Sequence, residues 1–170
     1  MSEQSQKVGL LELRIVNGAP YSGSVLHESA ADVLTRSLTR PDREVTTQQR
    51  LQHNWQMRYR SIASAPIALF CIDGQLDASR VMGVALASPD SNLRRITLEH
   101  LAVSPEFRSR GIGKQLLQHV FAHAAMLGVH ELFTTSVESP HQLYTDFGFT
   151  ETEEGALEAD YCDLRMPVLG

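Results

Sequence analysis

Apolar residues recur with two different spacings along the first part of the chain. Residues 8–16 form a short apolar run that predicts an opening strand, and Asn17-Gly18 predicts the turn that ends it. Helical spacing follows and predicts two helices, separated near Pro41. Their apolar positions are Val25, Leu26, Ala30, Val33 and Leu34 for the first helix, and Leu51, Trp55 and Tyr59 within residues 46–61 for the second.

The middle of the chain returns to strand-like runs. Residues 67–72 and 81–86 are short and apolar, and Asp73-Gly74 between them favours a turn, so we predict a β-hairpin. A third strand is predicted over residues 95–103, because Ser104-Pro105 ends that run.

From Gly113 the spacing becomes that of an amphipathic helix, which we expect to stop at Gly128. One face of this helix is apolar and should pack on the sheet, whereas the other is polar. The predicted apolar face contains Leu116, Leu117, Val120, Phe121, Ala124 and Leu127, and the polar face contains Lys114, Gln115, Gln118, His119 and His123.

The remaining residues predict short elements. We expect a strand at 131–137, a helix at 140–147, a short strand at 149–152 and a final strand at 160–168. Helices thus interrupt a mostly antiparallel series of strands, which predicts a mixed α/β sheet. No repeat, low-complexity tract or linker divides the sequence, so we expect one domain over residues 1–170.

Composition supports a packed globular domain and excludes several classes of protein. The 170 residues are 42% hydrophobic and 21% charged, which suffices for a core without a disulfide or a metal. The net charge of −5 argues against a nucleic-acid partner, and the absence of an apolar run of about 18 residues argues against a membrane span. Cys71 and Cys162 lie in apolar stretches and the N-terminus lacks a secretory pattern, so we expect buried thiols in a cytoplasmic protein.

The clearest indication of chemistry is the segment between the third strand and the amphipathic helix. A helix N-terminus presents unpaired N–H groups and the positive end of the helix dipole, which suits an anion. Gly111 and Gly113 let a phosphate approach these groups, and Arg108, Arg110 and Lys114 flank them. The segment lacks the Gly-Lys-Ser/Thr ending of a P-loop and the third glycine of the dinucleotide fingerprint. A tight turn among surface arginines is the alternative that two glycines leave open.

Two motifs make the sequence resemble the GNAT superfamily of N-acetyltransferases. Arg108-x-x-Gly111-x-Gly113, which follows the strand Leu98-Glu99-His100-Leu101-Ala102-Val103, is similar to the acetyl-CoA signature of that superfamily. Farther along, Tyr144-x-x-x-Gly148-Phe149 is similar to its C-terminal element. The motifs cover residues 95–150, and the order of strands and helices extends the resemblance over most of the chain.

The resemblance implies a GNAT-type α/β fold, with a mixed, largely antiparallel sheet flanked by helices and splayed between strands 95–103 and 131–137. Acetyl-CoA is then the co-substrate, with its pantetheine arm in the gap and its pyrophosphate on backbone N–H groups. No metal is expected. The implied cofactor-binding residues are Leu101, Ala102, Val103, Arg108, Ser109, Arg110, Gly111, Ile112, Gly113 and Lys114.

The resemblance also implies direct transfer of the acetyl group to a primary amine of a small molecule or peptide. Tyr144 matches the position of the family's general acid, which donates a proton to the departing thiolate. Glu99 is our candidate base, directly or through water. Strand alternation predicts that Thr97, Leu101 and Val103 share the face of Glu99.

Two departures from the family pattern leave the base open. Thr97 stands where many members have an acidic residue, and Glu138-Ser139-Pro140-His141 stands where many have an Asn. His100 or His141 is therefore an alternative to Glu99, or an aid to it, because an imidazole titrates near neutral pH.

Two further histidines have the spacing of metal ligands. His119 and His123 lie one helical turn apart, but on the polar face and without a third ligand nearby in sequence. A solvated helix face is the interpretation we adopt, with no metal.

Charge is unevenly distributed and bears on the acceptor. Residues 1–114 carry 14 basic and 11 acidic side chains, whereas residues 115–170 carry 1 basic and 9 acidic ones. An acidic loop either attracts a cationic amine or serves only solubility. It contains Glu151, Glu153, Glu154, Glu158 and Asp160.

Two other functions fit the same motifs. One is a non-catalytic module that binds or senses acyl-CoA, and the other is an enzyme that acetylates a protein lysine or N-terminus. The sequence also leaves open whether the protein is a monomer or a homodimer.

Overall fold

The structure is a computed structural model that describes residues 13–19, 23–38, 48–73, 80–136, 141–152 and 162–168. The elements are β1 (Leu13–Asn17), α1 (Val25–Leu38), α2 (Gln48–Ser64), β2 (Ile67–Asp73), β3 (Val81–Asp90), β4 (Arg95–Val103), a 3₁₀ helix (Pro105–Phe107), α3 (Ile112–Met126), β5 (Glu131–Ser136), α4 (His141–Phe147), β6 (Thr150–Glu151) and β7 (Cys162–Pro167).

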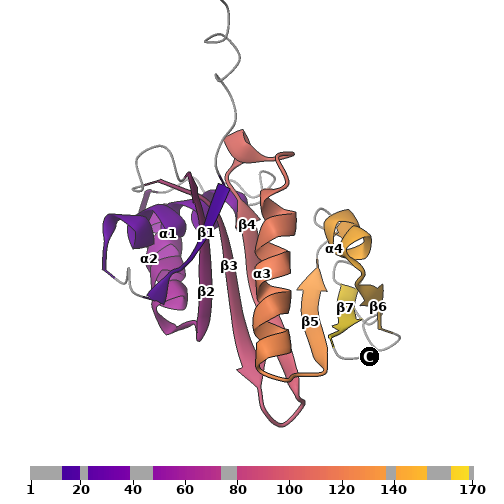
Figure 1. The fold of residues 1–170 in the computed structure, drawn as a ribbon. Coiled ribbons are helices and arrows are strands. Elements are labelled where there is room, and N and C mark those ends of the chain that lie inside the picture. The colour runs from indigo at the N-terminus through magenta and orange to yellow at the C-terminus, as the bar shows by residue number, and fades with distance from the viewer. Residues whose placement is uncertain are drawn as a thin grey trace, which may run out of the picture.

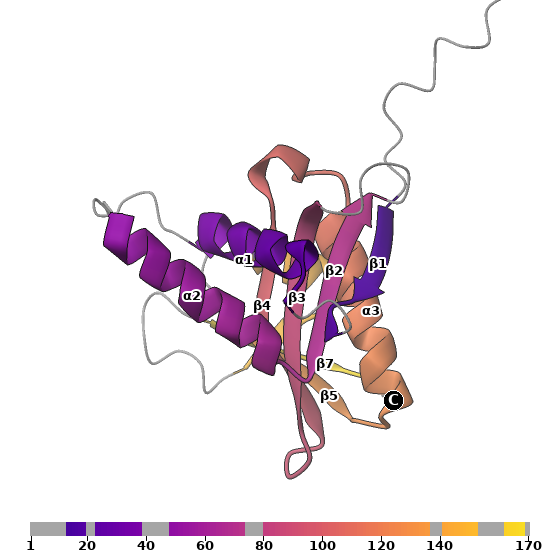
Figure 2. The same ribbon diagram turned by 90° about the vertical axis from the view of Figure 1, so that its left-hand side faces the viewer.

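The strands described form one sheet in the order β1-β2-β3-β4-β5-β7-β6. All neighbouring strands pair antiparallel except β4 and β5, which are parallel. Helices α1 and α2 cover one face of the sheet, and α3 covers the other (Figures 1 and 2). The expected mixed, largely antiparallel α/β sheet flanked by helices is therefore confirmed.

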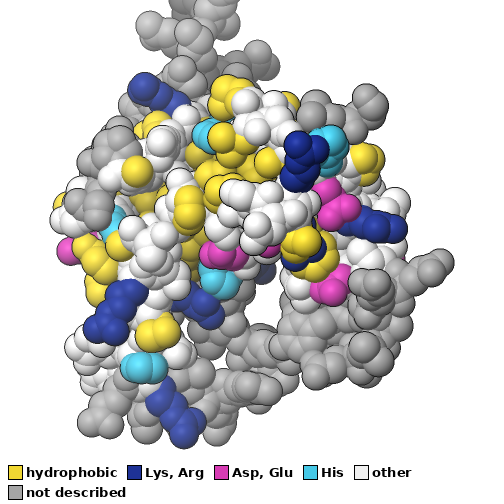
Figure 3. Space-filling view, turned by 90° about the horizontal axis from the view of Figure 1, so that it is seen from below, with side chains coloured by type: hydrophobic (Ala, Val, Ile, Leu, Met, Phe, Trp, Pro, Cys, Tyr) yellow, Lys and Arg dark blue, Asp and Glu magenta, His cyan; other side chains and the backbone are white. Residues whose placement is uncertain are grey.

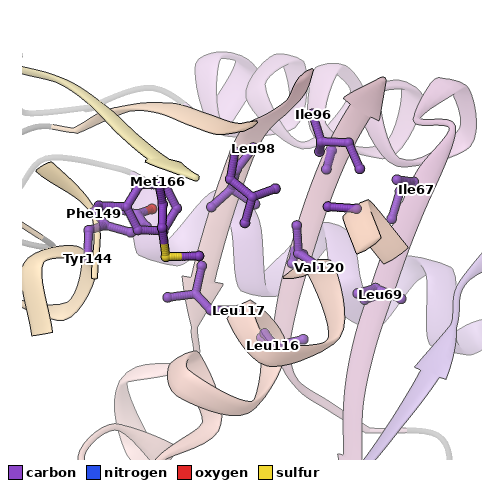
Figure 4. Packing of buried hydrophobic residues seen from close by; sticks show 14 of the residues in the cluster. Ile67, Leu69, Ile96, Leu98, Leu116, Leu117, Val120, Tyr144, Phe149 and Met166 are labelled. Atoms are coloured by element: carbon purple, nitrogen blue, oxygen red, sulfur yellow. The ribbon is translucent and has the colours of Figure 1, made fainter. Parts of the chain in front are cut away.

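The core consists of two layers, one on each face of the sheet. On the α3 side, Leu116, Leu117 and Val120 pack against strand residues such as Leu69 and Leu98 (Figure 4). On the other side, the buried residues of α1 pack against the opposite faces of β2, β3 and β4. Strand β2 is buried on both faces throughout, which explains the unbroken apolar run of residues 67–72.

The predicted element order is confirmed where the structure describes it. Three residues assigned to apolar helix faces are exposed, namely Val25 (61%), Leu51 (44%) and Leu127 (57%). Each lies in the first turn of a helix or just beyond its last residue, where the sheet no longer covers it. Other predicted features lie outside the described residues: the strand start at 8–12, Pro41, Gly74, and residues 137–140, 153–161 and 169–170.

The Cys71 side chain is a buried free thiol, as expected, whereas the side chain of Cys162 lies outside the described part of the chain. Burial, and then the nearby Asp73 carboxylate, raise the pKa of Cys71 to about 11. The thiol is therefore protonated at neutral pH. In the described residues, no helix combines the length and the apolar character needed to cross a bilayer.

Replacing Leu116 by Ala tests the α3 layer of the core. The Leu116 side chain is fully buried, so removing its methyl groups should lower the free energy of unfolding by about 2–5 kcal/mol. Leu127→Ala is the matched control, and at that exposed site the change should stay within about 0.5 kcal/mol. Equal losses in urea unfolding of the two variants would contradict this packing.

Candidate active site

The sheet divides partway along β4. The parallel pairing of β4 with β5 runs from Arg95↔Glu131 to Leu98↔Thr134, after which residues 99–103 pair only with β3. A β-bulge at Glu99 accompanies this end of the ladder, because Leu86 pairs with His100 and Ala87 with Leu98. The two halves of the sheet therefore diverge after Leu98, as the family resemblance implies.

Backbone groups on β4 face the resulting gap. Ser104 N–H donates to the Met82 carbonyl at 2.9 Å, which makes the neighbouring Gly83↔Val103 pair non-hydrogen-bonded. By alternation Ala85↔Leu101 is also non-hydrogen-bonded, so the N–H and C=O groups of Leu101 point away from β3. These groups and the Val103 N–H are the ones expected to pair with a pantetheine arm.

The Val103 carbonyl already accepts two hydrogen bonds from side chains. Ser37 Oγ donates to it at 3.1 Å, and Arg108 Nε donates to it at 3.3 Å. The Arg108 side chain thus ties the start of the glycine loop to the end of β4. Sequence reasoning assigned Arg108 to the cofactor and did not identify Ser37, which comes from α1.

The glycine loop leads into α3 with a left-handed backbone. Gly111 is the N-cap of α3 with φ 78°, and a Cβ placed on it would meet no atom within 4 Å. Because Gly111 has no side chain to cap the helix, the N–H groups of the first turn of α3 remain available for an anion. This open, positively polarised surface fits a pyrophosphate.

Gly113 has a packing role that the sequence did not indicate. A Cβ at this position would lie 2.9 Å from Leu143 Cδ2, the end of a flexible side chain, so the Leu143 side chain would have to move. The glycine therefore accommodates the Leu143 side chain where α4 meets α3. Ile112 beside it is buried in the α3 layer of the core.

The short turn at residues 104–107, before the glycine loop, is stabilised by contacts to the Glu106 carboxylate. Arg80 pairs with Glu106 at 2.6 Å, and Ser104 Oγ donates to the same carboxylate at 2.6 Å. The Ser104 bond first, and to a smaller extent Arg80, lower the pKa of Glu106 to about 2.

Arg80 and Arg110 both lie over the Phe107 ring, 4.8 and 5.6 Å from its centre. Arg110, like the exposed Arg108, Ser109 and Lys114, is accessible for ligand binding.

Tyr144 projects from α4 toward the point where β4 and β5 part. It is buried with Phe149 and Met166 at one end of the core (Figure 4). Thr134 forms a hydrogen bond with Tyr144, and Thr134 Oγ1 donates to the Leu98 carbonyl at 3.0 Å. The phenol is thereby linked through Thr134 to the last paired residue of β4. Burial raises the pKa of Tyr144 to about 12, and the bond with Thr134 offsets part of the rise.

Glu99 is exposed on the face opposite α3. Its carboxylate accepts a hydrogen bond from Ser88 Oγ at 2.5 Å. The predicted sharing of this face with Leu101 and Val103 is wrong, because both pack on the α3 side of the core. The bulge inserts one residue and reverses the alternation beyond it.

The two alternative bases have partners of their own. Arg58 donates to Nε2 of the half-buried His100 at 3.3 Å, so the lone pair of that nitrogen is engaged. Burial, and then the charge of Arg58, lower the pKa of His100, whereas Glu99 raises it. His141 Nε2 lies 3.2 Å from the Glu151 carboxylate.

His119 and His123 are engaged with their own helix. The Nδ1 atoms donate to the carbonyls of Gln115 and His119, each at 2.9 Å. In the described ranges, no group of three His, Cys, Asp or Glu side chains could hold a metal.

Comparison with known proteins agrees with this geometry. Residues 69–151 match the family model of the acetyltransferase (GNAT) domain. No curated protein sequence matches the chain. The matched residues, just under half of the chain, thus resemble a GNAT acetyltransferase domain, in agreement with the splayed sheet and the glycine loop.

Solved structures share the fold at low sequence identity. Aminoglycoside 6′-acetyltransferase type Ii is 16% identical over 92% of this chain and 98% of its own, with a TM-score of 0.69. PaiA N-acetyltransferase from Thermoplasma acidophilum, solved in complex with coenzyme A, is 15% identical over 92% and 99%, with a TM-score of 0.67. Nourseothricin acetyltransferase is 22% identical, but the match spans 61% of this chain and 65% of that one, with a TM-score of 0.51.

The raised pKa of Tyr144 predicts a pH-dependent stability. An unfolded tyrosine ionises near pH 10, before folded Tyr144 does, so this contribution is complete below about pH 10 and is lost as the pH rises toward about 12. From about pH 8 to about pH 11, the parent should lose about 1.4 kcal/mol more unfolding free energy than Tyr144→Phe. Urea unfolding at the two pH values measures this difference. Parallel losses would show that Tyr144 ionises normally.

Proposed function

We propose that this protein transfers the acetyl group of acetyl-CoA to a primary amine. The observation that supports the proposal is the gap after Leu98 and Thr134, which has backbone groups of Leu101 that point away from β3 on one side and Tyr144 at its apex. The open N-terminus of α3 lies at the far end of β4, where a pyrophosphate fits. Leu101, Val103 and the loop at 108–114 are the proposed cofactor contacts.

In the proposed reaction the neutral amine nitrogen attacks the carbonyl carbon of the thioester. The C–N bond forms and the C–S bond breaks, and the sulfur leaves as a thiolate. Tyr144 supplies the proton that the thiolate takes up, and burial keeps its phenol protonated at neutral pH. The proton lost by the amine passes to the base.

Glu99 is the base that the geometry favours. It is exposed beside the gap, and only one of its oxygens accepts from Ser88. His100 is neutral at physiological pH, but Arg58 engages the nitrogen that would accept the proton. His141 is paired with Glu151. We therefore retain Glu99, directly or through water, ahead of either histidine.

The proposed acceptor is a small molecule or a peptide end, and the chain is proposed to work as one cytoplasmic domain. The hypothesis that acidic residues attract a cationic acceptor falls largely on residues 153–160, outside the described residues. Glu151 is described and pairs with His141. An acyl-CoA sensor without turnover is the alternative, and release of free CoA thiol with a panel of amines distinguishes it from an enzyme.

Replacing Gly111 by Val should weaken CoA binding by at least about tenfold, because a side chain would cover the N–H groups of the loop. Gly128→Val is the matched control. Gly128 also has a positive φ and open space, but it follows the C-terminal end of α3. Calorimetry should show unchanged CoA affinity for that variant. Equal affinity of both variants would remove the loop from the cofactor site.

Tyr144→Phe should lower kcat by about 10²–10⁴-fold while leaving the affinity for acetyl-CoA nearly intact. The phenylalanine keeps the packing against Phe149 but has no proton for the thiolate. Steady-state kinetics and calorimetry on the same preparation separate the two effects. A loss below about threefold would mean that water protonates the thiolate.

Glu99→Gln should reduce kcat and shift the rate optimum to higher pH, where more of the free amine is already neutral. His100→Gln is the control for the competing base and should leave the optimum in place. The pH profile of kcat/KM for both variants makes the comparison. A profile that moves only in His100→Gln would assign the base to the histidine.

A further inference from the structure

A cleft of about 630 Å³ lies on the face of the sheet opposite α3. Leu132, Leu164 and Met166 point into the α3 layer of the core, so the alternate residues of β5 and β7 face this cleft. In the view from below, basic and acidic side chains lie close together on the side formed by β5, β6 and β7, beside a hollow (Figure 3). The lining residues are Arg95, Glu131, Phe133, Glu151, Thr152, Asp163 and Arg165.

Among the described residues, neither arginine of the cleft forms an ion pair, although Glu131, which also lines the cleft, is the neighbour of Arg95 in the β4–β5 register. Arg95 lies over the Phe133 ring, 4.2 Å from its centre, and its Nε is buried without a hydrogen-bond partner among the described residues. Arg165 is opposite Phe133 in the register of β5 and β7. The Arg95 Nε is shielded from solvent and cannot itself reach a ligand, but both arginines line the cleft, so their outer N–H groups can donate to an anion there.

The acidic side chains of the cleft restrict the kind of anion. Glu151 is paired with His141, and Asp163 accepts a hydrogen bond from Thr135 Oγ1 at 2.8 Å. These negative charges disfavour a dianion such as a phosphate monoester. A single carboxylate fits better, because it matches the planar fork of a guanidinium and carries one charge.

The cleft also has a defined relation to the proposed reaction. Arg95 precedes Glu99 by four residues on β4, which corresponds to about 13 Å of strand. Glu99 shares the cleft's face, because it bonds to Ser88, the β3 partner of Thr97. A molecule whose carboxylate lies at Arg95 can therefore extend along β4 and present its other end at Glu99.

We propose that the acetyl acceptor carries a carboxylate at the end remote from its amine, and that Arg95 and Arg165 bind this carboxylate over Phe133. This inference rests on the proposed N-acetyltransferase function and specifies its substrate class. The acceptor is then an elongated amino acid or a peptide-like amine with a free carboxylate.

The test compares probes that differ only in the remote group. Acetylation of 6-aminohexanoate and 8-aminooctanoate is measured against their methyl esters, against hexylamine and octylamine, and against 6-aminohexyl phosphate. At least one amino acid should exceed its ester and its alkylamine by about tenfold in kcat/KM, the effect of one charge-assisted contact. In Arg165→Gln, and in Arg95→Gln if it folds, the difference should fall below about twofold.

Arg14→Gln is the matched control, because Arg14 is an exposed strand residue at the opposite edge of the sheet. It should keep the full preference. Equal rates for amino acids, esters and alkylamines would overturn the carboxylate site while leaving the acetyltransferase intact. A preference for the aminoalkyl phosphate would also overturn it. If no amine of any class releases CoA thiol from acetyl-CoA, the proposed function itself fails.

Discussion

The end of the β4–β5 ladder at Leu98 and Thr134 is the constraint on which the rest of the site depends. Parallel pairing stops there, and a bulge at Glu99 turns the second half of β4 away from β5. The opening leaves backbone hydrogen-bonding groups of Leu101 unused by the sheet. These groups point toward the opening, so an extended ligand can pair with them as an added strand would.

Side-chain packing fixes the elements on both sides of the opening, α3 with β4 on one side and α4 with β5 on the other. Helix α3 is fixed on β3 and β4 by fully buried leucines, and the Leu143 side chain of α4 lies against Gly113 of α3. Thr134 connects Tyr144 to the Leu98 carbonyl. A buried phenol with a raised pKa therefore lies at the apex, where the proposed reaction needs a proton donor.

The two faces of the sheet carry different parts of the proposed site. The glycine loop and Tyr144 belong to the α3 side, whereas Glu99 and the cleft with Arg95 lie on the opposite side. A thioester held in the gap would therefore be accessible from both faces of the sheet. In the proposed reaction the acceptor would approach along β4 from the face that carries the charged residues.

The sequence predicted the order of elements because their apolar spacing matches the faces that the sheet buries. It also predicted the glycine loop and the position of Tyr144, since these are local motifs. It did not predict the bulge, which has no side-chain signature, so the face assigned to Leu101 was wrong. Thr134 carried a weak signal, as a polar residue in a strand position that alternation buries.

The pairing of distant residues was beyond the sequence altogether. Arg95 and Arg165 are 70 positions apart and line one cleft only because β4, β5 and β7 are neighbours in the sheet. Arg58 of α2 likewise reaches His100 of β4, which lies 42 positions further along the chain. Such contacts follow from strand order, which periodicity does not determine.

The central claim is that the opening after Leu98 holds the CoA arm as an added strand. Amide hydrogen exchange, followed residue by residue by NMR with and without CoA, tests it most directly. The account predicts that the Leu101 amide exchanges slowly only when CoA is bound, while the Ala102 amide, which pairs with β3, is protected in both states. Saturating CoA that leaves exchange at Leu101 unchanged would contradict the account.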